Sequence, residues 1–144
     1  MIPRFDGRYR FLSNFAPSPI ALNGNIAPTV EHGFQAAKAI SEQAARRILA
    51  ADSPAEAKRM GRELKHCRED WDQVRLGFML SLLAEKFGQN PDLRQRLIAT
   101  HDEELVEGNN WGDTYWGVCD GVGTNWLGRL LMVTRSLIVL EDSK

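Results

Sequence analysis

Glu31, Gln35 and Lys38 have the types and the spacing of groups that do chemistry together. They stand in T-V-E-H-G-F-Q-A-A-K at residues 29–38. Offsets of four and seven residues place them along one stripe of a helix, beside an apolar stripe. A carboxylate, an amide and an amine then share one wall, which suits a phosphorylated or sugar-bearing ligand. The plainer alternatives are a favourable first-turn charge for Glu31 and a solvated helix face for the other two.

Residues 107–128 form a second unusual segment, E-G-N-N-W-G-D-T-Y-W-G-V-C-D-G-V-G-T-N-W-L-G, with six glycines and three tryptophans. Asp113 lies in a glycine-flanked loop beside Trp111 and Trp116. Flat aromatic faces can stack on a base, and Phe5 offers another such face. Alternatively, these aromatic residues fill a core thinned by glycines. We expect one tryptophan to stack on the ligand and the rest to pack, and Trp71 and Trp126, both at helix starts, are expected to be structural.

The sequence has few features of a metal site or of a dinucleotide-binding site. The three histidines lack partners at metal-ligand spacing, and neither H-E-x-x-H nor C-x-x-C occurs. Gly121-Val122-Gly123 lacks the third glycine and the strand-turn-helix setting of a dinucleotide loop. Cys119 as a nucleophile would need a neighbouring histidine. We therefore expect no metal and no cofactor.

Length and charge limit the class of protein. At 144 residues with 43% hydrophobic content, the chain fits one compact domain covering residues 1–144. Eighteen basic and nineteen acidic side chains give a net charge of −1, so no global field attracts nucleic acid or anionic membranes. The two cysteines fit a reducing compartment. The charged N-terminal segment does not resemble a signal peptide, and no apolar run reaches bilayer length, so we expect a cytoplasmic protein.

The elements that must position these groups are mainly helical. Capping residues predict helices that begin after Thr29, Ser41, Ser53, Asp70 and Asn90. The helix after Asp70, ending at Gly88, should be the longest and most buried. A last helix has the inner stripe Leu127, Leu130, Leu131, Thr134, Leu137 and Ile138.

The β structure should be small. Residues 11–28 predict an extended segment followed by a hairpin, with Asn23-Gly24 as its turn. Short strands are expected near 104–119, at 104–107 and 115–119. The fold class is therefore mainly α, a single multihelical domain with a small β element.

Five blocks of sequence carry a resemblance to one known family. They are F-D-G-R-Y-R-F-L-S-N-F at 5–15, T-V-E-H-G-F-Q-A-A-K at 29–38, A-K-R-M-G-R at 57–62, W-G-D-T-Y-W-G-V at 111–118 and G-T-N-W-L-G-R-L-L-M at 123–132. In this order they resemble the NADAR, or YbiA-like, family of N-glycosidases. The resemblance implies a compact, mainly α fold and hydrolysis of a bond between ribose C1′ and nitrogen. Family substrates include phosphoribosylamino intermediates of riboflavin synthesis and, in other branches, ADP-ribose on guanine bases.

Two departures from the family pattern bear on substrate identity. Ala16 follows S-N-F where the family often has an aromatic residue, and Gly33 follows E-H where a larger residue is common. Both substitutions are expected to alter the width of the pocket.

The chemistry of such a cleavage assigns roles to the candidate residues. Positive charge develops on the ribose and negative charge on the departing nitrogen, so the site needs a carboxylate and a proton donor. We predict Glu31 and Asp113 as this pair, lining a common cleft. Lys38 is the third catalytic candidate, either attacking C1′ to form an imine or holding a phosphate. The candidate substrate-binding residues are Arg4, Phe5, Ser13, Asn14, Gln35, Gly61, Arg62, Trp111 and Trp116.

The sequence thus predicts a metal-independent N-glycosidase acting on a small phosphoribosylamino or ADP-ribosyl substrate. One alternative is a glycohydrolase that removes ADP-ribose from guanine bases, in which nucleic acid is the partner only as ADP-ribosylated substrate. Another is a non-catalytic module that binds ADP-ribose or NAD. No membrane partner is expected, and the sequence leaves the oligomeric state open.

Overall fold

The computed structural model describes residues 1–144 and divides into two compact units. The central unit comprises residues 14–90, and the terminal unit comprises residues 1–13 with 91–144. Six α-helices, one 3₁₀ helix and two two-stranded sheets make up the chain. The prediction of a mainly α fold with a small β element is confirmed.

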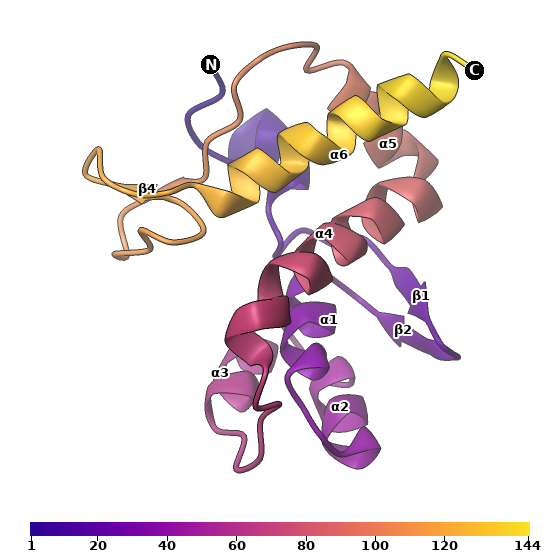
Figure 1. The fold of residues 1–144 in the computed structure, drawn as a ribbon, viewed down its shortest axis with the longest axis vertical. Coiled ribbons are helices and arrows are strands. Elements are labelled where there is room, and N and C mark those ends of the chain that lie inside the picture. Colours follow the sequence, from indigo (N-terminus) through magenta and orange to yellow (C-terminus); the bar gives the residue numbers. More distant parts are fainter. The chain divides into compact units, whose positions relative to one another are not determined.

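The central unit begins with the predicted hairpin. Strand β1 (Ile20–Leu22) pairs antiparallel with β2 (Asn25–Ala27), as Figure 1 shows. The turn has positive φ angles at Asn23 (46°) and Gly24 (84°), the conformation that an Asn-Gly pair favours.

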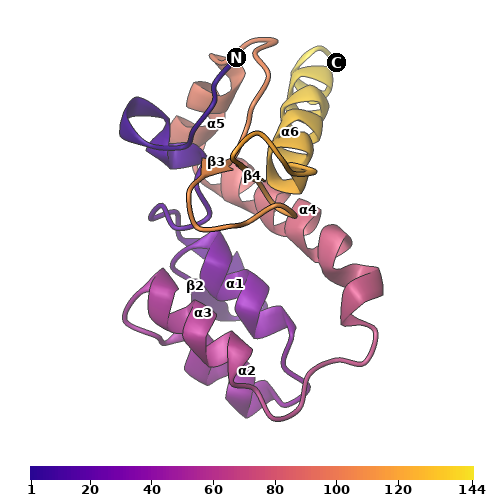
Figure 2. The same ribbon diagram turned by 90° about the vertical axis from the view of Figure 1, so that its left-hand side faces the viewer.

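Three short helices follow, each begun by the predicted hydroxyl. In each, the capping oxygen accepts the N–H of the residue three positions on: Thr29 for α1 (Val30–Ala37), Ser41 for α2 (Glu42–Leu49) and Ser53 for α3 (Pro54–Arg62). Figure 2 shows α1 beside α2 and α3, and α1 contacts both. Seven of the eight α1 residues are buried, so α1 is the centre of this unit.

Helix α4 (Trp71–Gln89) is the longest, as predicted. Its Asp70 makes no side-chain capping bond and instead pairs with Arg68, Oδ1 to Nε, at 2.9 Å. The prediction that this helix is the most buried is wrong. Its buried residues lie from Met79 onward, because the first two turns have only half-covered apolar side chains.

The terminal unit contains η1 (Gly7–Leu12), α5 (Pro91–Ile98), β3 (Gly108–Asn109), β4 (Val118–Cys119) and α6 (Trp126–Asp142). The predicted extended segment is wrong at its start. Phe11 and Leu12 end a 3₁₀ helix instead, a compact turn in which both adjacent apolar side chains are buried. The strands expected near 104–119 are present and pair in parallel, although β3 begins after the predicted 104–107.

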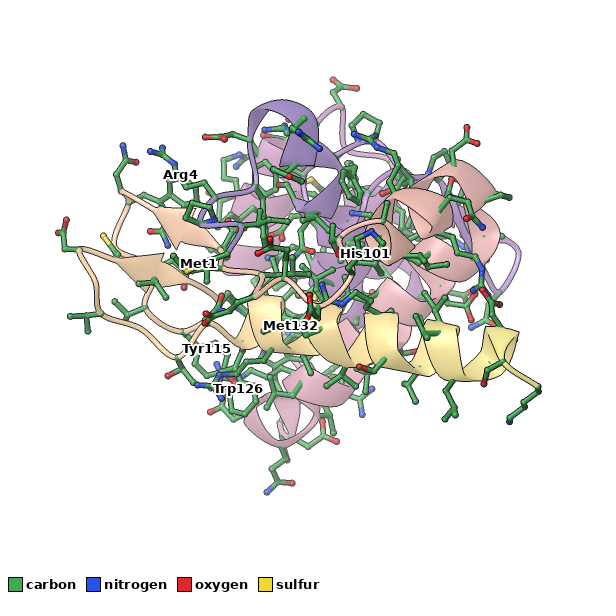
Figure 3. All side chains as sticks on the ribbon, turned by 90° about the horizontal axis from the view of Figure 1, so that it is seen from above. Met1, Arg4, His101, Tyr115, Trp126 and Met132 are labelled. Carbon is green, nitrogen blue, oxygen red and sulfur yellow. The ribbon has the colours of Figure 1, made fainter.

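Helix α6 follows its predicted inner stripe except at Leu137, which is 53% exposed. Positions 134 and 138 already face inward, and position 137 is rotated away from them. Figure 3 shows Tyr115 and Trp126 close together at the start of this helix, where the Trp126 N–H donates to the Tyr115 carbonyl at 3.1 Å. None of the helices combines the length and apolar character that a membrane crossing requires.

Candidate active site

Glu31 is a buried carboxylate in the first turn of α1, only 7% exposed. Gln35, one turn later and also buried, donates from Nε2 to Glu31 Oε1 at 2.7 Å. Glu31 and Gln35 therefore lie on one face of α1, as predicted, and are joined by a hydrogen bond. The N–H of Glu31 donates to the Asn14 carbonyl at 3.1 Å, so the start of α1 is held by the segment before β1.

Burial raises the pKa of Glu31 above its ordinary value. The bond from Gln35 and the positive charges of Lys58, Lys38 and His32 act in the opposite direction. A carboxylate held in this balance can take up a proton near neutral pH more readily than an exposed one, as a general base requires.

Lys38 caps the C-terminal end of α1 and is half-buried. Burial lowers the pKa of its amine, against the raising effect of Glu31, while Arg62 and Lys58 lower it further. Its Nζ lies 6.0 Å from the centroid of the Phe34 ring and 5.8 Å from that of Trp71. The lowered pKa favours the neutral, nucleophilic form of the amine relative to an exposed lysine.

Gly61 allows α3 to approach α1 at the position of Gln35. A β-carbon added at Gly61 would lie 1.9 Å from Gln35 Oε1, so any side chain here would displace the amide. That oxygen is buried and has no hydrogen-bond partner. The pairing of Gly61 with Gln35 explains why α3 contributes a glycine to the site, a role that sequence alone could not assign.

Helix α3 also supplies cations. Arg62 is exposed, and Lys58, one turn earlier, is half-buried. Lys58 affects the pKa of both Glu31 and Lys38. Sequence reasoning missed Lys58, whose only signal was its spacing of one helical turn from the predicted Arg62.

Asn14 meets Glu31 through its backbone, while its side chain points elsewhere. Its Nδ2 donates to Met79 Sδ at 3.6 Å, and its Oδ1 is buried without a partner. Ser13 belongs to the terminal unit and donates its N–H to Arg10 O at 2.9 Å.

Asp113 organises the loop between β3 and β4. Its Oδ1 accepts the N–H groups of Tyr115, at 3.1 Å, and Trp116, at 2.9 Å. This is an Asx-type turn, a structural use of the carboxylate, and the catalytic role of Asp113 stays a prediction.

Asn109 holds the same loop and was missed by sequence reasoning. Its Nδ2 donates to three carbonyls, those of Glu107, Asp113 and Val118, at 2.9–3.3 Å. Its Oδ1 accepts the N–H groups of Trp111 at 3.3 Å and Asp113 at 3.0 Å. The glycine-rich composition indicated an ordered loop, but it did not reveal which side chain holds the loop in place.

The remaining predicted residues of the terminal unit differ in accessibility. Trp111 is 63% exposed, which leaves its faces open. Trp116 is half-buried and contacts Tyr115 edge to face, with centroids 4.9 Å apart. Phe5 is buried, and Arg4 Nε lies 3.4 Å from Asp6 Oδ2 in an exposed ion pair. Arg4 itself is labelled in Figure 3.

The structure thus brings together the predicted residues of the central unit around α1. These are Asn14, Glu31, Gln35, Lys38, Gly61 and Arg62. The others, including Asp113, belong to the terminal unit, so the shared cleft of Glu31 and Asp113 stays a prediction.

Of the three histidines, His32 is placed for packing, whereas His66 and His101 are exposed. His32 is buried, with Nδ1 2.9 Å from Thr29 Oγ1 and Nε2 2.9 Å from the Ala51 carbonyl. No group of three or more His, Cys, Asp or Glu side chains is arranged to hold a metal ion.

Known proteins are similar to this chain in sequence and in fold. Residues 4–139 match the family described as the NADAR domain. The N-glycosidase YbiA of Shigella flexneri is 42% identical over 92% of this chain and 84% of that protein. A riboflavin biosynthesis protein of Vibrio vulnificus is 39% identical over 90% of this chain and 36% of that protein. The NMR structure of the E. coli protein YbiA superposes with a TM-score of 0.88 at 37% identity, covering 100% of this chain and 90% of that one.

Proposed function

This chain belongs to the NADAR domain family, and on that premise we propose that it is an N-glycosidase that hydrolyses the C1′–N bond of a phosphoribosylamino or ADP-ribosyl substrate, with water as acceptor. The proposal draws its reaction from the relatives named N-glycosidase and its substrate class from those named for riboflavin biosynthesis. The observation that carries it is the buried Glu31 carboxylate, which is hydrogen-bonded to Gln35 and faced by lysines.

Glu31 is the group that acts at the ribose. As the C1′–N bond breaks, the ring carbon gains positive charge, which a nearby carboxylate stabilises. Glu31 also accepts the proton of the attacking water, because burial raises the pKa of its carboxyl and so strengthens it as a base. Gln35 fixes the orientation of the carboxylate during this step.

Lys38 has two possible roles in this site. As an amine with a lowered pKa it attacks C1′ and forms an imine with the opened sugar, displacing the base, and water then releases the sugar. As a cation it joins Arg62 and Lys58 in holding a phosphate. Borohydride added during turnover separates these roles, because an imine is reduced to a stable adduct on Lys38 and the water-only route leaves none.

The remaining proposed roles fall to residues of the terminal unit. Asp113 is proposed to orient water or to protonate the leaving nitrogen. Arg4, Phe5, Ser13, Trp111 and Trp116 are proposed to contact the phosphate and the base.

The proposal is tested by incubating the purified protein with phosphoribosylamino compounds, NAD, ADP-ribose and ADP-ribosylated guanosine, and detecting released base by mass spectrometry. Wild-type protein should release base from the phosphoribosylamino or the ADP-ribosylated substrate. Glu31→Gln should retain substrate binding and lose about 1,000-fold in kcat, because the amide cannot accept the proton of water.

Two outcomes would contradict this proposal. If the wild-type protein binds ADP-ribose or NAD but never releases a base, the protein is a binding module. If Glu31→Gln turns over like the wild type, the catalytic carboxylate lies elsewhere.

A further inference from the structure

Helix α6, the helix that ends in yellow in Figure 1, has apolar side chains on two of its sides. One side is the buried inner stripe. On the other, Val133 is 43% exposed, Leu137 53% and Leu140 58%. Their spacing of four and three residues places them on a second stripe, about 10 Å long at a rise of 1.5 Å per residue. This outer stripe of α6 is a contiguous apolar patch, the kind of surface that contacts another protein.

Hydrogen bonds and an ion pair hold the outer stripe facing outward. Arg135, on the opposite side of the helix, is 7% exposed, and its Nη1 donates to Thr100 Oγ1 at 2.9 Å. Asp142, in the last turn, forms an ion pair with Arg94 of α5. Both contacts lie within the terminal unit and fix the rotation of α6 about its axis. The helix thus keeps an arginine inside and two leucines outside, the reverse of the ordinary preference of these side chains.

The two ends of the outer stripe have opposite charges. Arg129, one turn before Val133, is exposed, and its Nε donates to the Thr124 carbonyl at 2.6 Å. Glu141, one turn after Leu137, is also exposed. The stripe is therefore apolar in the middle, basic at its beginning and acidic at its end.

Such a surface is complementary to itself when it is turned end to end. In a two-fold dimer both copies use the same surface. Arg129 precedes Val133 by four residues, and Glu141 follows Leu137 by four. An antiparallel register that sets Val133 against Leu137 of a second copy therefore brings Arg129 level with Glu141 of that copy. Parallel pairing would place each charge beside its own kind, which is unfavourable. The charge pattern thus favours an antiparallel pair.

We propose that the outer stripe of α6 is a dimer interface, on which a second copy of this chain docks antiparallel through its own outer stripe. Val133, Leu137 and Leu140 form the apolar centre, and Arg129 and Glu141 form the charged rim at both ends. A stable interface buries about 800 Å² on each partner, and a single helix face offers less. The dimer is therefore weak, with a Kd in the micromolar range.

Sedimentation velocity from micromolar to millimolar concentration tests the apolar centre. The wild type should show a monomer–dimer equilibrium. Leu137→Asp puts one charge from each copy into the centre and should raise the Kd by about 100-fold. Leu137 is half exposed, so this variant should fold, which a thermal melt verifies.

Val122→Asp is the matched control, because Val122 is 65% exposed and lies in the terminal unit outside α6. Its Kd should equal that of the wild type. A wild type that is monomeric at every concentration would overturn the inference. A Leu137→Asp variant that dimerises like the wild type, or equal weakening by Leu137→Asp and Val122→Asp, would overturn it as well.

Charge reversal tests the antiparallel register. Arg129→Glu and Glu141→Arg each place like charges together at both ends of the dimer, and each should raise the Kd by about 10-fold. The double variant brings opposite charges together again and should recover the wild-type Kd. If the double variant dimerises no better than the single ones, the copies do not pair in this way and the proposed interface is wrong. These measurements need no substrate, so their outcome is separate from that of the proposed hydrolysis.

Discussion

The stripe on α1 and the loop at residues 107–125 use their polar side chains in opposite ways. On α1, Glu31 is buried with a raised pKa and Lys38 is half-buried with a lowered one. In the loop, Asp113 and Asn109 direct their side chains to backbone N–H and carbonyl groups of the loop itself. The first region holds groups in electrostatically unfavourable states, and the second uses its groups to maintain a shape.

The contrast separates reactive groups from supporting ones. Desolvated, mutually coupled charges destabilise a fold, and proteins keep them mainly where chemistry needs them. An Asx turn and an asparagine with five hydrogen-bonding contacts stabilise a loop that has little hydrophobic core of its own. Substitutions on α1 should therefore change mainly activity, and substitutions in the loop should change mainly stability. At Asp113 both effects are tested.

Asp113 offers the largest expected effect after Glu31 itself. Asp113→Asn keeps an oxygen that accepts the N–H groups of Tyr115 and Trp116 but removes the charge. If the carboxylate transfers a proton, kcat should fall about 100-fold, while the melting temperature stays near that of the wild type. Initial rates and thermal melts of the same preparation measure both quantities.

Asp113→Ala is the paired variant. It removes the oxygen that accepts both N–H groups and should cost about 1–3 kcal/mol of stability, the usual penalty for orphaned backbone groups. If Asp113→Asn has wild-type kcat and only Asp113→Ala is impaired, Asp113 is a loop residue and the second carboxylate of the site must be found elsewhere.

Gly61 gives an intermediate effect. The β-carbon of Gly61→Ala would lie 1.9 Å from Gln35 Oε1, so the amide must move and its bond to Glu31 must break or lengthen. We expect kcat/KM to fall about tenfold, since the carboxylate loses its positioning partner. Overpacking should also lower the free energy of unfolding by about 1–3 kcal/mol.

Gly77→Ala is the control for Gly61→Ala, because no atom lies within 4 Å of the added carbon on α4. It should stabilise the protein by up to about 1 kcal/mol through helix propensity and leave kcat/KM unchanged. In a Gln35→Ala background, Gly61→Ala should regain most of its lost stability. Additive losses in the double variant would show that the contact is not the cause.

The sequence predicted those parts of the fold that depend on local signals. Thr29, Ser41 and Ser53 cap helices because a hydroxyl oxygen just before a helix can accept one of the N–H groups that the first turn leaves unpaired. The contact between Glu31 and Gln35 follows from helical spacing alone. Such features are determined by residues that lie within a few positions of one another in the sequence.

Features that depend on distant segments escaped prediction. Gly61 fits against Gln35 only because α3 packs on α1, and Lys58 joins the site for the same reason. Trp71 was expected to be structural, and its neighbour Lys38, with Nζ 5.8 Å from the ring centroid, could not be foreseen, because the link between the Arg68 N–H and the Lys38 carbonyl joins distant segments. Leu137 and the first turns of α4 were assigned to the interior from periodicity, which does not show how far a neighbouring element extends.

The smallest expected effect is a dependence of stability on pH that belongs to the α1 stripe. Burial raises the pKa of Glu31 in the folded protein above its ordinary value of 4.5, so the unfolded chain releases this proton first. Stability contributed by the protonated form is complete below pH 4.5 and is lost as pH rises through the folded pKa. Glu31→Gln keeps an oxygen that accepts the bond from Gln35 but does not ionise. Its advantage over the wild type in urea unfolding should therefore grow from pH 4.5 upward and then level off.

Glu69→Gln is the matched control, since the Glu69 carboxylate is exposed and stays in water when the chain unfolds. Its difference from the wild type should not follow the pH course of Glu31→Gln. If the wild type instead gained on Glu31→Gln as pH rose, the lysines around Glu31 would more than offset its burial. The ionised Glu31 would then stabilise the fold, as the polar side chains of the loop do. The distinction between the two regions would therefore not hold for Glu31, the residue on which it depends most.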